Sequence, residues 1–402
     1  MTDISIVVPT YWGWPVGEPG RPEDAIYDHP TPRDQEGTLG RLLESLEKVE
    51  HPDFNVLVLT SALNPQLEEA VEAKVEAIIA PFQESYPIAQ FASSDLAVLH
   101  RRMEELGFDE FIPFISLRGY PNVRNLQLIV PHLMRAEIIV ALDDDEVVVA
   151  DYLVKATEFI GREHQGKPVL GIAGFYLDRE GNTLLPEGEP TGNIFLDKSA
   201  IMNQGIRALE AAPGRLVETP IALGGNMVIH RRLFEMVSFD PYITRGEDID
   251  YLINASLRGF GFWLDKQLVI THLPPEASNG SPTWSRLHQD VLRFIYEREK
   301  LRSAMAAATA VAGTDPSQFD PYPGRFLRED VTTQAIEALR RVADAQMEAR
   351  LGSAEDIVAG ALRAAEEKVA RYFAFAREWP ATMTTLGKDA ALRRYLRGKI
   401  AE

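Results

Sequence analysis

The chain contains the segment Ala136-Glu137-Ile138-Ile139-Val140-Ala141-Leu142-Asp143-Asp144-Asp145-Glu146, in which an apolar run ends at consecutive acidic residues. A short apolar run bounded by polar residues is typical of a strand that is buried in a parallel sheet. In open sheets with helices on both faces, ligands bind beyond the carboxyl ends of the strands. We therefore predict a strand over Ala136 to Leu142 and a ligand site at the acidic residues that follow it.

Strand and helix patterns alternate before this segment. β-branched and apolar runs predict two earlier strands, Ile4 to Thr10, stopped by proline, and Phe54 to Thr60. Helical spacing predicts helices over Leu39 to Val49, Pro65 to Ala80 and Val123 to Leu133. This alternation predicts a doubly wound α/β sheet.

The later sequence divides into two parts. A short helix is expected over Gly246 to Leu257, and a strand over Gln267 to Thr271 that ends at His272. From Trp284 onward the sequence becomes rich in Ala, Arg and Glu, with interruptions expected at Asp315 to Arg325 and at Pro380. We predict an α/β domain over 1–280 and a helical C-terminal extension over 281–402, whose apolar faces pack on the domain or on a second copy in a homo-oligomer.

Composition excludes several classes of protein. The 60 acidic and 41 basic residues give a formal net charge of −19, which disfavours nucleic acid as a partner. Cysteine is absent, so a metal site must use oxygen or histidine ligands. No apolar window long enough to span a membrane and no signal segment is evident, and we expect a cytoplasmic protein.

The three aspartates fit a divalent metal site. Carboxylate oxygens suit Mg²⁺ or Mn²⁺, and such an ion would offset the repulsion between a diphosphate and this acidic chain. The alternative is a solvated acidic turn that caps the next helix.

Other candidate residues each have a structural alternative. Glu247 and Asp248 open a helix, where the helix dipole favours carboxylates whether or not they do chemistry. Gly224 and Gly225 would let the backbone approach a bulky ligand, or form a plain turn. His272 at a strand end would be a metal ligand or phosphate contact, or a structural residue. His288 and Arg293 would reach donor phosphates, or lie on a solvated helix face.

Two rival nucleotide-binding classes lack their motifs. The segment Gly259 to Leu264 has two of the three glycines of a dinucleotide fingerprint and follows a helix, and no G-K-[ST] phosphate loop occurs. A sugar nucleotidyltransferase would need a glycine-rich, basic segment after the first strand, where this chain has Pro9-Thr10-Tyr11-Trp12.

Four motifs in order resemble glycosyltransferase family 2 and the GT-A fold. They are Val8-Pro9-Thr10-Tyr11, Arg124-Asn125 at a helix start, Asp143 to Asp145, and Gly246-Glu247-Asp248. The resemblance covers about residues 3 to 273. The chain departs from the family's pattern in the long Pro-, Gly- and Asp-rich insertion Trp12 to Gly37, which would form part of an acceptor site or only decorate the surface.

The resemblance implies roles for these residues. Pro9, Thr10, Tyr11, Arg124, Asp143 and Asp144 would bind the nucleotide diphosphate sugar donor, and Gly224, Gly225 and Asn226 would contact the sugar or the acceptor. Asp145 and His272 would hold Mg²⁺ or Mn²⁺, and Asp248, with Glu247 as its neighbouring candidate, would be the general base.

The implied activity is that of a metal-dependent hexosyltransferase with a small or soluble acceptor. Two alternatives stay open. One is a retaining GT-A enzyme that makes a sugar glycerate-type solute. The other is a protein that binds nucleotide sugars without turnover, because a fold alone does not imply a function.

Overall fold

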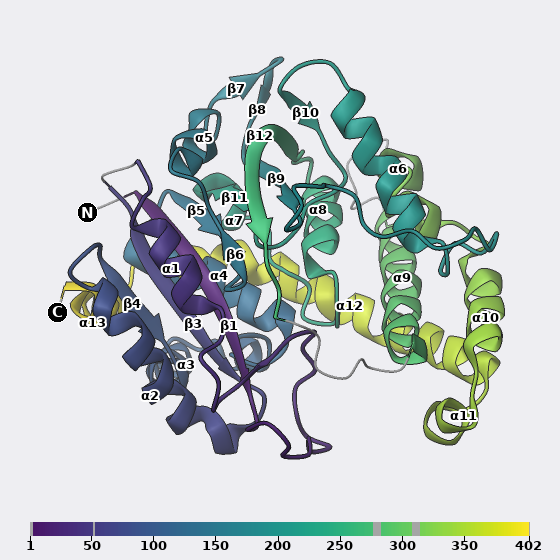
Figure 1. Ribbon diagram of the computed structural model, residues 1–402, viewed down its shortest axis with the longest axis horizontal. Helices are drawn as coiled ribbons and strands as arrows, with labels where there is room; N and C mark the ends of the chain where they lie inside the picture. The colour runs from purple at the N-terminus through teal and green to yellow at the C-terminus, as the bar shows by residue number, and fades with distance from the viewer. Residues whose placement is uncertain (1–2, 51–52, 276–282, 308–313, 402) are drawn as a thin grey trace.

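The computed structural model describes residues 3–50, 53–275, 283–307 and 314–401, in which helices cover both faces of one large mixed sheet (Figure 1). The expected boundary between residues 280 and 281 lies outside the described residues. The sheet order is β10-β12-β9-β11-β5-β1-β3-β4. The predicted α/β class is confirmed.

The sheet has a parallel half and a mixed half. Strand β5 is the edge of the parallel half and pairs with β11 of the mixed half. The parallel half consists of β1 (Ile4–Gly13), β3 (Asn55–Ala62), β4 (Ile88–Phe91) and β5 (Ile138–Ala141). The mixed half consists of β11 (Met227–His230), β9 (Gly171–Leu177), β12 (Trp263–His272) and β10 (Leu216–Glu218). Two short strands complete the sheet: β2 (Thr31–Pro32) pairs with β1, and β6 (Glu146–Val147) pairs with β12. A separate hairpin joins β7 (Glu163–His164) and β8 (Lys167–Pro168).

The sequence analysis expected Pro9 to stop the first strand, but the strand continues past it. Strand β1 continues through Pro9 to Gly13 and stays paired with β3. The Val7 carbonyl faces β5 and accepts from the Leu142 N–H. Residues two apart face the same side of a strand, so the missing N–H of Pro9 points to the side where β5 has already ended.

Alternate residues of each central strand face different helical layers. Ile6 and Val8 of β1 pack with α1 (Leu39–Leu46), α2 (Glu68–Ile79) and α5 (Tyr152–Glu158). Val7 faces the opposite layer, which contains α4 (Tyr120–Met134) and α8 (Glu247–Leu257). The same layer includes α3 (Ser93–Glu105), α6 (Lys198–Ala211) and α7 (Arg231–Phe234). Strands buried on both faces explain the unbroken apolar runs of the sequence.

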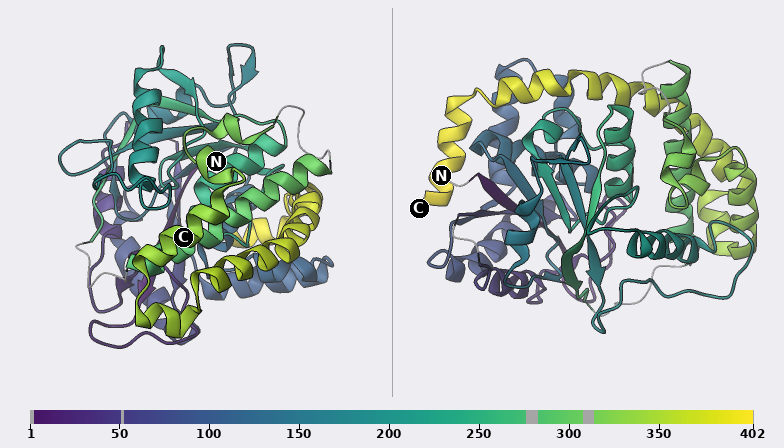
Figure 2. Two further views of the ribbon diagram at one scale, coloured as in Figure 1. Left: turned by 90° about the vertical axis from the view of Figure 1, so that its right-hand side faces the viewer. Right: turned by 90° about the horizontal axis from the view of Figure 1, so that it is seen from above.

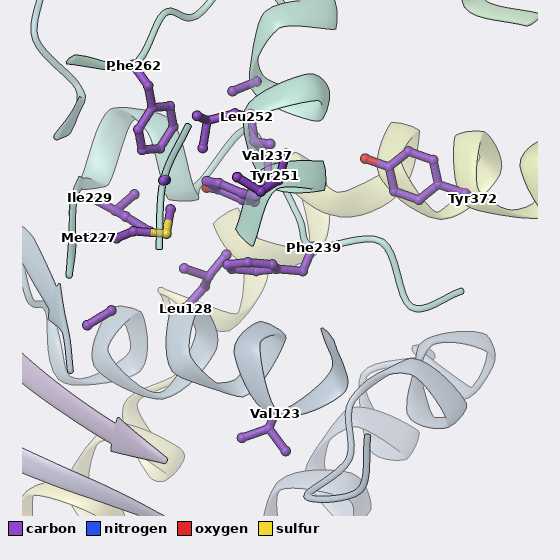
Figure 3. Packing of buried hydrophobic residues seen from close by; sticks show 14 of the residues in the cluster. Val123, Leu128, Met227, Ile229, Val237, Phe239, Tyr251, Leu252, Phe262 and Tyr372 are labelled. Carbon is purple, nitrogen blue, oxygen red and sulfur yellow. The ribbon is translucent and has the colours of Figure 1, made fainter. Parts of the chain in front are cut away.

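The larger core lies between α4, α8 and the mixed half of the sheet (Figure 3). Phe239 and Tyr251 stack with ring centroids 4.3 Å apart, and Leu128 of α4 belongs to the same cluster. Met227 and Ile229 of β11 complete the contact from the sheet side. This packing fixes the start of α8 relative to the carboxyl end of β5.

The C-terminal part is helical, as predicted. Its helices are α9 (Thr283–Ala306), α10 (Val331–Val342), α11 (Ala345–Leu351), α12 (Ala354–Leu386) and α13 (Ala390–Ala401). Helix α12, yellow-green to yellow in Figure 2, runs along the face opposite α1 and α2. The Pro-rich stretch forms two 3₁₀ turns, Pro316–Phe319 and Gly324–Leu327. Earlier 3₁₀ turns lie at Pro65–Leu67, Ala80–Phe82 and Asp109–Phe114.

Pro380 does not interrupt the helix, contrary to the expectation from sequence. It lies inside α12. A proline cannot donate to the carbonyl four residues before it, here that of Ala376. The Arg258 guanidinium donates to this carbonyl instead. The lost helical hydrogen bond is therefore replaced from α8's C-terminal end.

The C-terminal helices share the core of the α/β part. The Trp379 indole N–H donates to the Phe234 carbonyl at 2.9 Å, and its ring is fully buried. Lys300 of α9 is also fully buried and donates to Asp240 at 2.9 Å and Asp250 at 2.5 Å. Removing one partner from a buried ion pair leaves an uncompensated charge, which is strongly destabilising.

We predict that a chain ending at residue 280 is insoluble or aggregated, because it loses Lys300, Trp379 and the apolar faces that cover α8 and α4. Size-exclusion chromatography of the purified fragment is the measurement. A monodisperse fragment with a cooperative thermal transition would show that 281–402 is a separate module.

Among the described helices, none combines the length and apolar character that crossing a bilayer requires.

Candidate functional site

The carboxyl ends of β1 and β5 bring the first and third motifs together. These strands pair in parallel with Val7 opposite Ala141. Thr10 and Asp144 each come three residues after this pair, so they lie side by side. The Thr10 hydroxyl donates to Asp144 Oδ2 at 2.5 Å and accepts from the Trp12 indole N–H at 2.9 Å. Thr10 is fully buried. Thr10 therefore holds the Asp144 carboxyl against the end of β1.

Burial raises the pKa of Asp144 to about 8, and the nearby charge of Asp145 adds to the effect, while the Thr10 hydrogen bond opposes it. Asp144 is thus protonated at neutral pH in the folded chain. A neutral carboxyl is a poor metal ligand, since ligation requires the deprotonated form.

We predict that Asp144→Asn reduces the pH dependence of stability. The folded pKa of about 8 lies above the ordinary value of 3.8, so stability is fully present below about pH 4 and falls as pH rises to 8. For one proton the slope is at most about 1.4 kcal/mol per pH unit. The amide has no such proton, so the variant loses less stability between pH 5 and 8. Urea unfolding at both pH values measures this, and equal slopes for both proteins would refute it.

Arg124 of α4 connects the third and fourth motifs. Its Nη2 donates to Asp143 Oδ1 at 2.9 Å, and its Nε donates to Glu247 Oε1 at 3.2 Å. Nη1 donates to Gln127 at 3.1 Å, and the side chain is buried. This guanidinium therefore holds the end of β5 against the start of α8.

The Arg124-Asn125 pair lies one turn inside its helix and not at the start, because α4 begins at Tyr120. Asn125 is fully buried. Its Nδ2 donates to the Phe239 carbonyl at 3.2 Å, and its Oδ1 accepts from the Phe239 N–H at 2.9 Å. The pair thus anchors both the acidic strand end and the segment that leads to Gly246.

Asp145 and His272 meet through strand pairing. Strand β6 pairs with β12 so that His272 lies opposite Glu146, next to Asp145. His272 Nε2 lies 3.2 Å from Asp145 Oδ2. Burial lowers the pKa of His272, but the hydrogen bond with Asp145 and the charges of Asp145 and Asp143 raise it overall.

Arg41 of α1 fixes the backbone around this pair, and the sequence analysis missed it. Its Nη2 donates to the Leu273 carbonyl at 2.6 Å and to the Asp145 carbonyl at 3.3 Å. The Leu273 N–H in turn donates to the Asp145 carbonyl at 2.8 Å. No sequence motif marked Arg41, since its partners are backbone atoms distant along the chain.

The Asp145–His272 pair fits two adjacent ligands of one divalent ion. Two donor atoms about 2.1 Å from an ion and at right angles to each other lie about 3.0 Å apart. The observed 3.2 Å is close to this distance. Within the described residues, no group of three or more His, Asp or Glu side chains could hold a metal. The remaining ligands would be water or substrate oxygens, as Mg²⁺ sites commonly have.

Asp248 lies at the start of α8, facing the glycine pair. Its Oδ2 accepts from the Gly224 N–H at 3.0 Å, and its Oδ1 accepts from the Ile249 N–H at 2.7 Å. These two donors orient the carboxylate, which is half-buried. Burial raises the pKa of neighbouring Glu247 to about 7, against the lowering effect of Arg124.

The glycine pair makes room for the chain's own side chains. A Cβ on Gly224 would lie 2.5 Å from Arg124 Nη2, and a Cβ on Gly225 would lie 2.0 Å from Glu146 Oε1. Both contacts are far closer than side chains tolerate. The sequence analysis left open whether these glycines make room for a ligand or form a plain turn, and in the structure Arg124 and Glu146 fill the space beside them. The backbone of the pair still borders the site through Asp248.

Asn226 is held within the sheet. Its Oδ1 accepts from the Tyr152 hydroxyl at 2.8 Å, and its Nδ2 donates to the Phe175 and Leu268 carbonyls at 3.1 and 3.2 Å. The side chain is fully buried. This geometry gives Asn226 a structural function, so we do not retain it among the sugar-contacting candidates.

Tyr11 belongs to a cluster of three tyrosines beside the acidic site. Its ring centroid lies 4.3 Å from that of Tyr27 and 5.1 Å from that of Tyr120. Tyr27 comes from the insertion, and its hydroxyl accepts from the Gly119 N–H at 2.9 Å. The insertion is therefore packed against the first motif and is not a detached loop.

Glu146 and Tyr176 are further site residues that the sequence analysis did not assign. Glu146 Oε2 accepts from the Asp143 N–H at 2.9 Å, and burial, with the charges of Asp143 and Asp145, raises its pKa well above 4.5. The Tyr176 hydroxyl accepts from the Gly225 N–H at 2.6 Å, and its ring lies 5.3 Å from that of His272. The run of acidic residues already contained the signal for Glu146.

Arg293 does not lie on a solvated face. It is buried, and its Nε donates to Glu297 at 2.8 Å. Gly246 packs on this guanidinium with a φ of 71°, and a Cβ there would lie 1.8 Å from Arg293 Nη1. Arg293 thus supports the start of α8. His288 lies elsewhere, in the wall of a pocket described below.

Comparisons with known proteins found distant similarity to solved structures. No family model matches the chain, and no curated protein matches it. The mannosyltransferase PcManGT from Pyrobaculum calidifontis, in complex with GDP-Man and Mn²⁺, has a TM-score of 0.43 and 14% identity over 98% of this chain and 87% of that chain. A mycobacterial protein has a TM-score of 0.38 and 16% identity over 73% of each chain.

A third similar structure is GalNAc-T7 with UDP, GalNAc and Mn²⁺, at a TM-score of 0.40 and 13% identity. The match covers 83% of this chain and 57% of that chain. These resemblances are distant, so the functional argument rests on the site itself.

Proposed function

We propose that the protein is a metal-dependent GT-A glycosyltransferase that transfers a sugar from a nucleotide diphosphate donor to a small or soluble acceptor. One observation carries the proposal: segments far apart in sequence contact one another at the carboxyl edge of the sheet. Thr10 binds Asp144, and Arg124 binds both Asp143 and Glu247. Asp248 binds Gly224. Ligands bind at this edge in α/β sheets.

The three aspartates have different proposed functions. Asp145, with His272, would hold Mn²⁺ or Mg²⁺, whose chemistry is to stabilise negative charge on the departing diphosphate. Asp143 is ionically paired with Arg124 and would border the nucleotide. Asp144 is neutral and maintains the strand edge through Thr10. Pro9 and Tyr11 would line the base.

Asp248 is the proposed general base. Its carboxylate is fixed by two N–H donors and remains half-exposed at the site. Glu247 is less suitable, because it is buried and its Oε1 already accepts from Arg124. A fixed carboxylate can take the proton of an acceptor hydroxyl as the new glycosidic bond forms, which describes an inverting transfer.

A thermal-shift screen of nucleotide sugars with Mn²⁺ tests the binding part of the proposal. A ligand that binds only the folded state raises the melting temperature, and the shift grows with the ratio of ligand concentration to Kd. We expect one donor to raise it only when Mn²⁺ is present. If no nucleotide sugar or nucleoside diphosphate shifts the transition with metal, the proposed function is wrong.

A further inference from the structure

A pocket of about 570 Å³ lies beside the proposed site, and the site residues described above do not account for it. Its walls come from the segment Pro241 to Thr244 and from four other parts of the chain. The four other parts are the insertion at Ala25 and Ile26, the start of α4 at Gly119 to Asn122, the N-terminal turns of α9, and the end of α11. Its volume is in the range that holds a drug-sized molecule.

The lining is apolar and aromatic. Tyr120, Ile243, Trp284 and Leu292 supply most of its character. No carboxylate is among the lining residues that the structure describes, although the chain carries a net charge of −19. Burial lowers the pKa of His288, which is therefore neutral at pH 7. Among the described residues that line the pocket, Arg350 is the charged one. The pocket therefore fits an apolar or weakly anionic occupant.

Trp284 supplies a second sign of an occupant. Its side chain is only 6% exposed, and its indole N–H has no hydrogen-bond acceptor among the described residues. A buried indole N–H usually finds a partner. The Arg350 guanidinium lies 6.0 Å from the centre of this ring, over its face. The pocket therefore combines an aromatic wall with an unused donor.

Tyr120 connects the lining of the pocket to the proposed site. This ring packs on Tyr11 at 5.1 Å, and the charges of Glu247 and Asp143 both act on its hydroxyl. On the other side, Ile243 and Thr244 line the pocket only a few residues before α8 begins at Glu247. The pocket wall therefore includes part of the segment that leads into α8.

Polar contacts hold the insertion in place as the outer wall. The Asp28 N–H donates to the Tyr120 hydroxyl at 2.7 Å, and Arg245 Nε donates to Asp28 Oδ2 at 3.2 Å. The Ala25 N–H donates to the Leu63 carbonyl at 2.9 Å. Ile26, between these anchors, is 70% exposed. Ile26 therefore adds an apolar side chain to the outer wall of the pocket.

We propose that this pocket binds the non-reacting part of the acceptor, and that the acceptor is an alcohol with an aromatic or similarly apolar body. The inference rests on the proposed function. The acceptor oxygen would form a bond to the anomeric carbon of the donor, while the bond from that carbon to the diphosphate oxygen breaks. The diphosphate leaves with the bonding electron pair, and Asp248 takes the hydroxyl proton. A three-carbon glycerate would leave most of the pocket empty.

Ser285 and Ser303 offer a matched pair of variants for the test. Both lie on α9, but Ser285 lines the pocket and Ser303 is exposed outside it. The probe is 4-methylumbelliferone, an aromatic alcohol, whose fluorescence anisotropy is followed on titration with the full-length protein. Donor affinity with Mn²⁺ is measured in parallel, and thermal melting checks that each variant is folded.

We expect Ser285→Trp to weaken probe binding by at least about tenfold, because the indole occupies apolar space that the probe needs. Ser303→Trp should bind the probe like the wild type, and both variants should keep wild-type donor affinity. Absent probe binding by the wild type, or equal binding by folded Ser285→Trp, overturns the proposal. Loss of donor affinity alone in Ser285→Trp would assign the pocket to the donor and also overturn it.

One further outcome separates this inference from the proposed function. If no donor binds with Mn²⁺ while the probe still binds and Ser285→Trp abolishes it, the glycosyltransferase assignment fails. The acceptor function then fails with it, although the pocket is a real binding site.

Discussion

The Asp248→Asn variant is expected to retain donor and metal binding and to lose about 10²- to 10⁴-fold in turnover, the usual contribution of general base catalysis. An amide preserves the shape of the carboxylate but cannot accept the acceptor's proton. Asp248 now accepts from two N–H groups, those of Gly224 and Ile249, whereas an amide has only one acceptor oxygen. The variant therefore also loses about 1–3 kcal/mol of stability, and steady-state assays must be run well below its melting temperature.

Glu247→Gln is the control for this experiment. It removes the neighbouring carboxyl, which is buried and paired with Arg124, so it should affect stability more than the chemical step. Near wild-type turnover of Asp248→Asn would show that Asp248 only supports the start of α8. A product with retained anomeric configuration, determined by NMR, would independently contradict a mechanism with this base.

The Asp145→Ala variant is expected to lose Mn²⁺-dependent donor binding by about 100-fold or more, since changes even to partners of metal ligands cost about 10- to 100-fold. Asp145 and His272 are the only two proposed protein ligands, so removing one leaves a single imidazole. The diphosphate would then lack the ion that offsets its repulsion by this acidic chain. Isothermal calorimetry with and without Mn²⁺ measures the effect.

Asp144→Asn is the matched control, because it changes the adjacent aspartate, which is already neutral at pH 7. This control should bind donor and Mn²⁺ like the wild type. Unchanged Mn²⁺-dependent affinity in Asp145→Ala would show that Asp145 is not a ligand. Equal losses in both variants would indicate a general disturbance of the strand end.

Much of the fold followed from patterns of hydrophobic residues. The apolar runs before Pro9 and Asp143 correctly predicted β1 and β5, because strands buried on both faces leave no polar positions. The sequence could not predict that β1 continues through Pro9 or that α12 continues through Pro380. Pro9 is tolerated because β5 has ended beside it, and Pro380 because Arg258 replaces its missing donor. Both depend on tertiary neighbours.

The candidate site shows the same division. The order of motifs identified Thr10, Arg124 and the aspartates, and the structure brings them into contact. The order of motifs could not distinguish the three aspartates, because their different partners depend on strand register. Arg41 and Tyr176 were missed because they contact backbone atoms, which leave no residue pattern. For the glycine pair the sequence left a ligand contact and a plain turn open, and it did not indicate that Arg124 and Glu146 fill the space beside it.

Donor cleavage by the full-length wild-type protein tests the central claim most directly. Release of nucleoside diphosphate from a panel of nucleotide sugars is followed by chromatography, first with Mn²⁺ and then after its removal with a chelator. The account predicts that one donor is cleaved with Mn²⁺, that chelation abolishes release, and that added Mn²⁺ restores it. Release that continues unchanged in chelator, or no release from any donor with any acceptor class, would contradict the account.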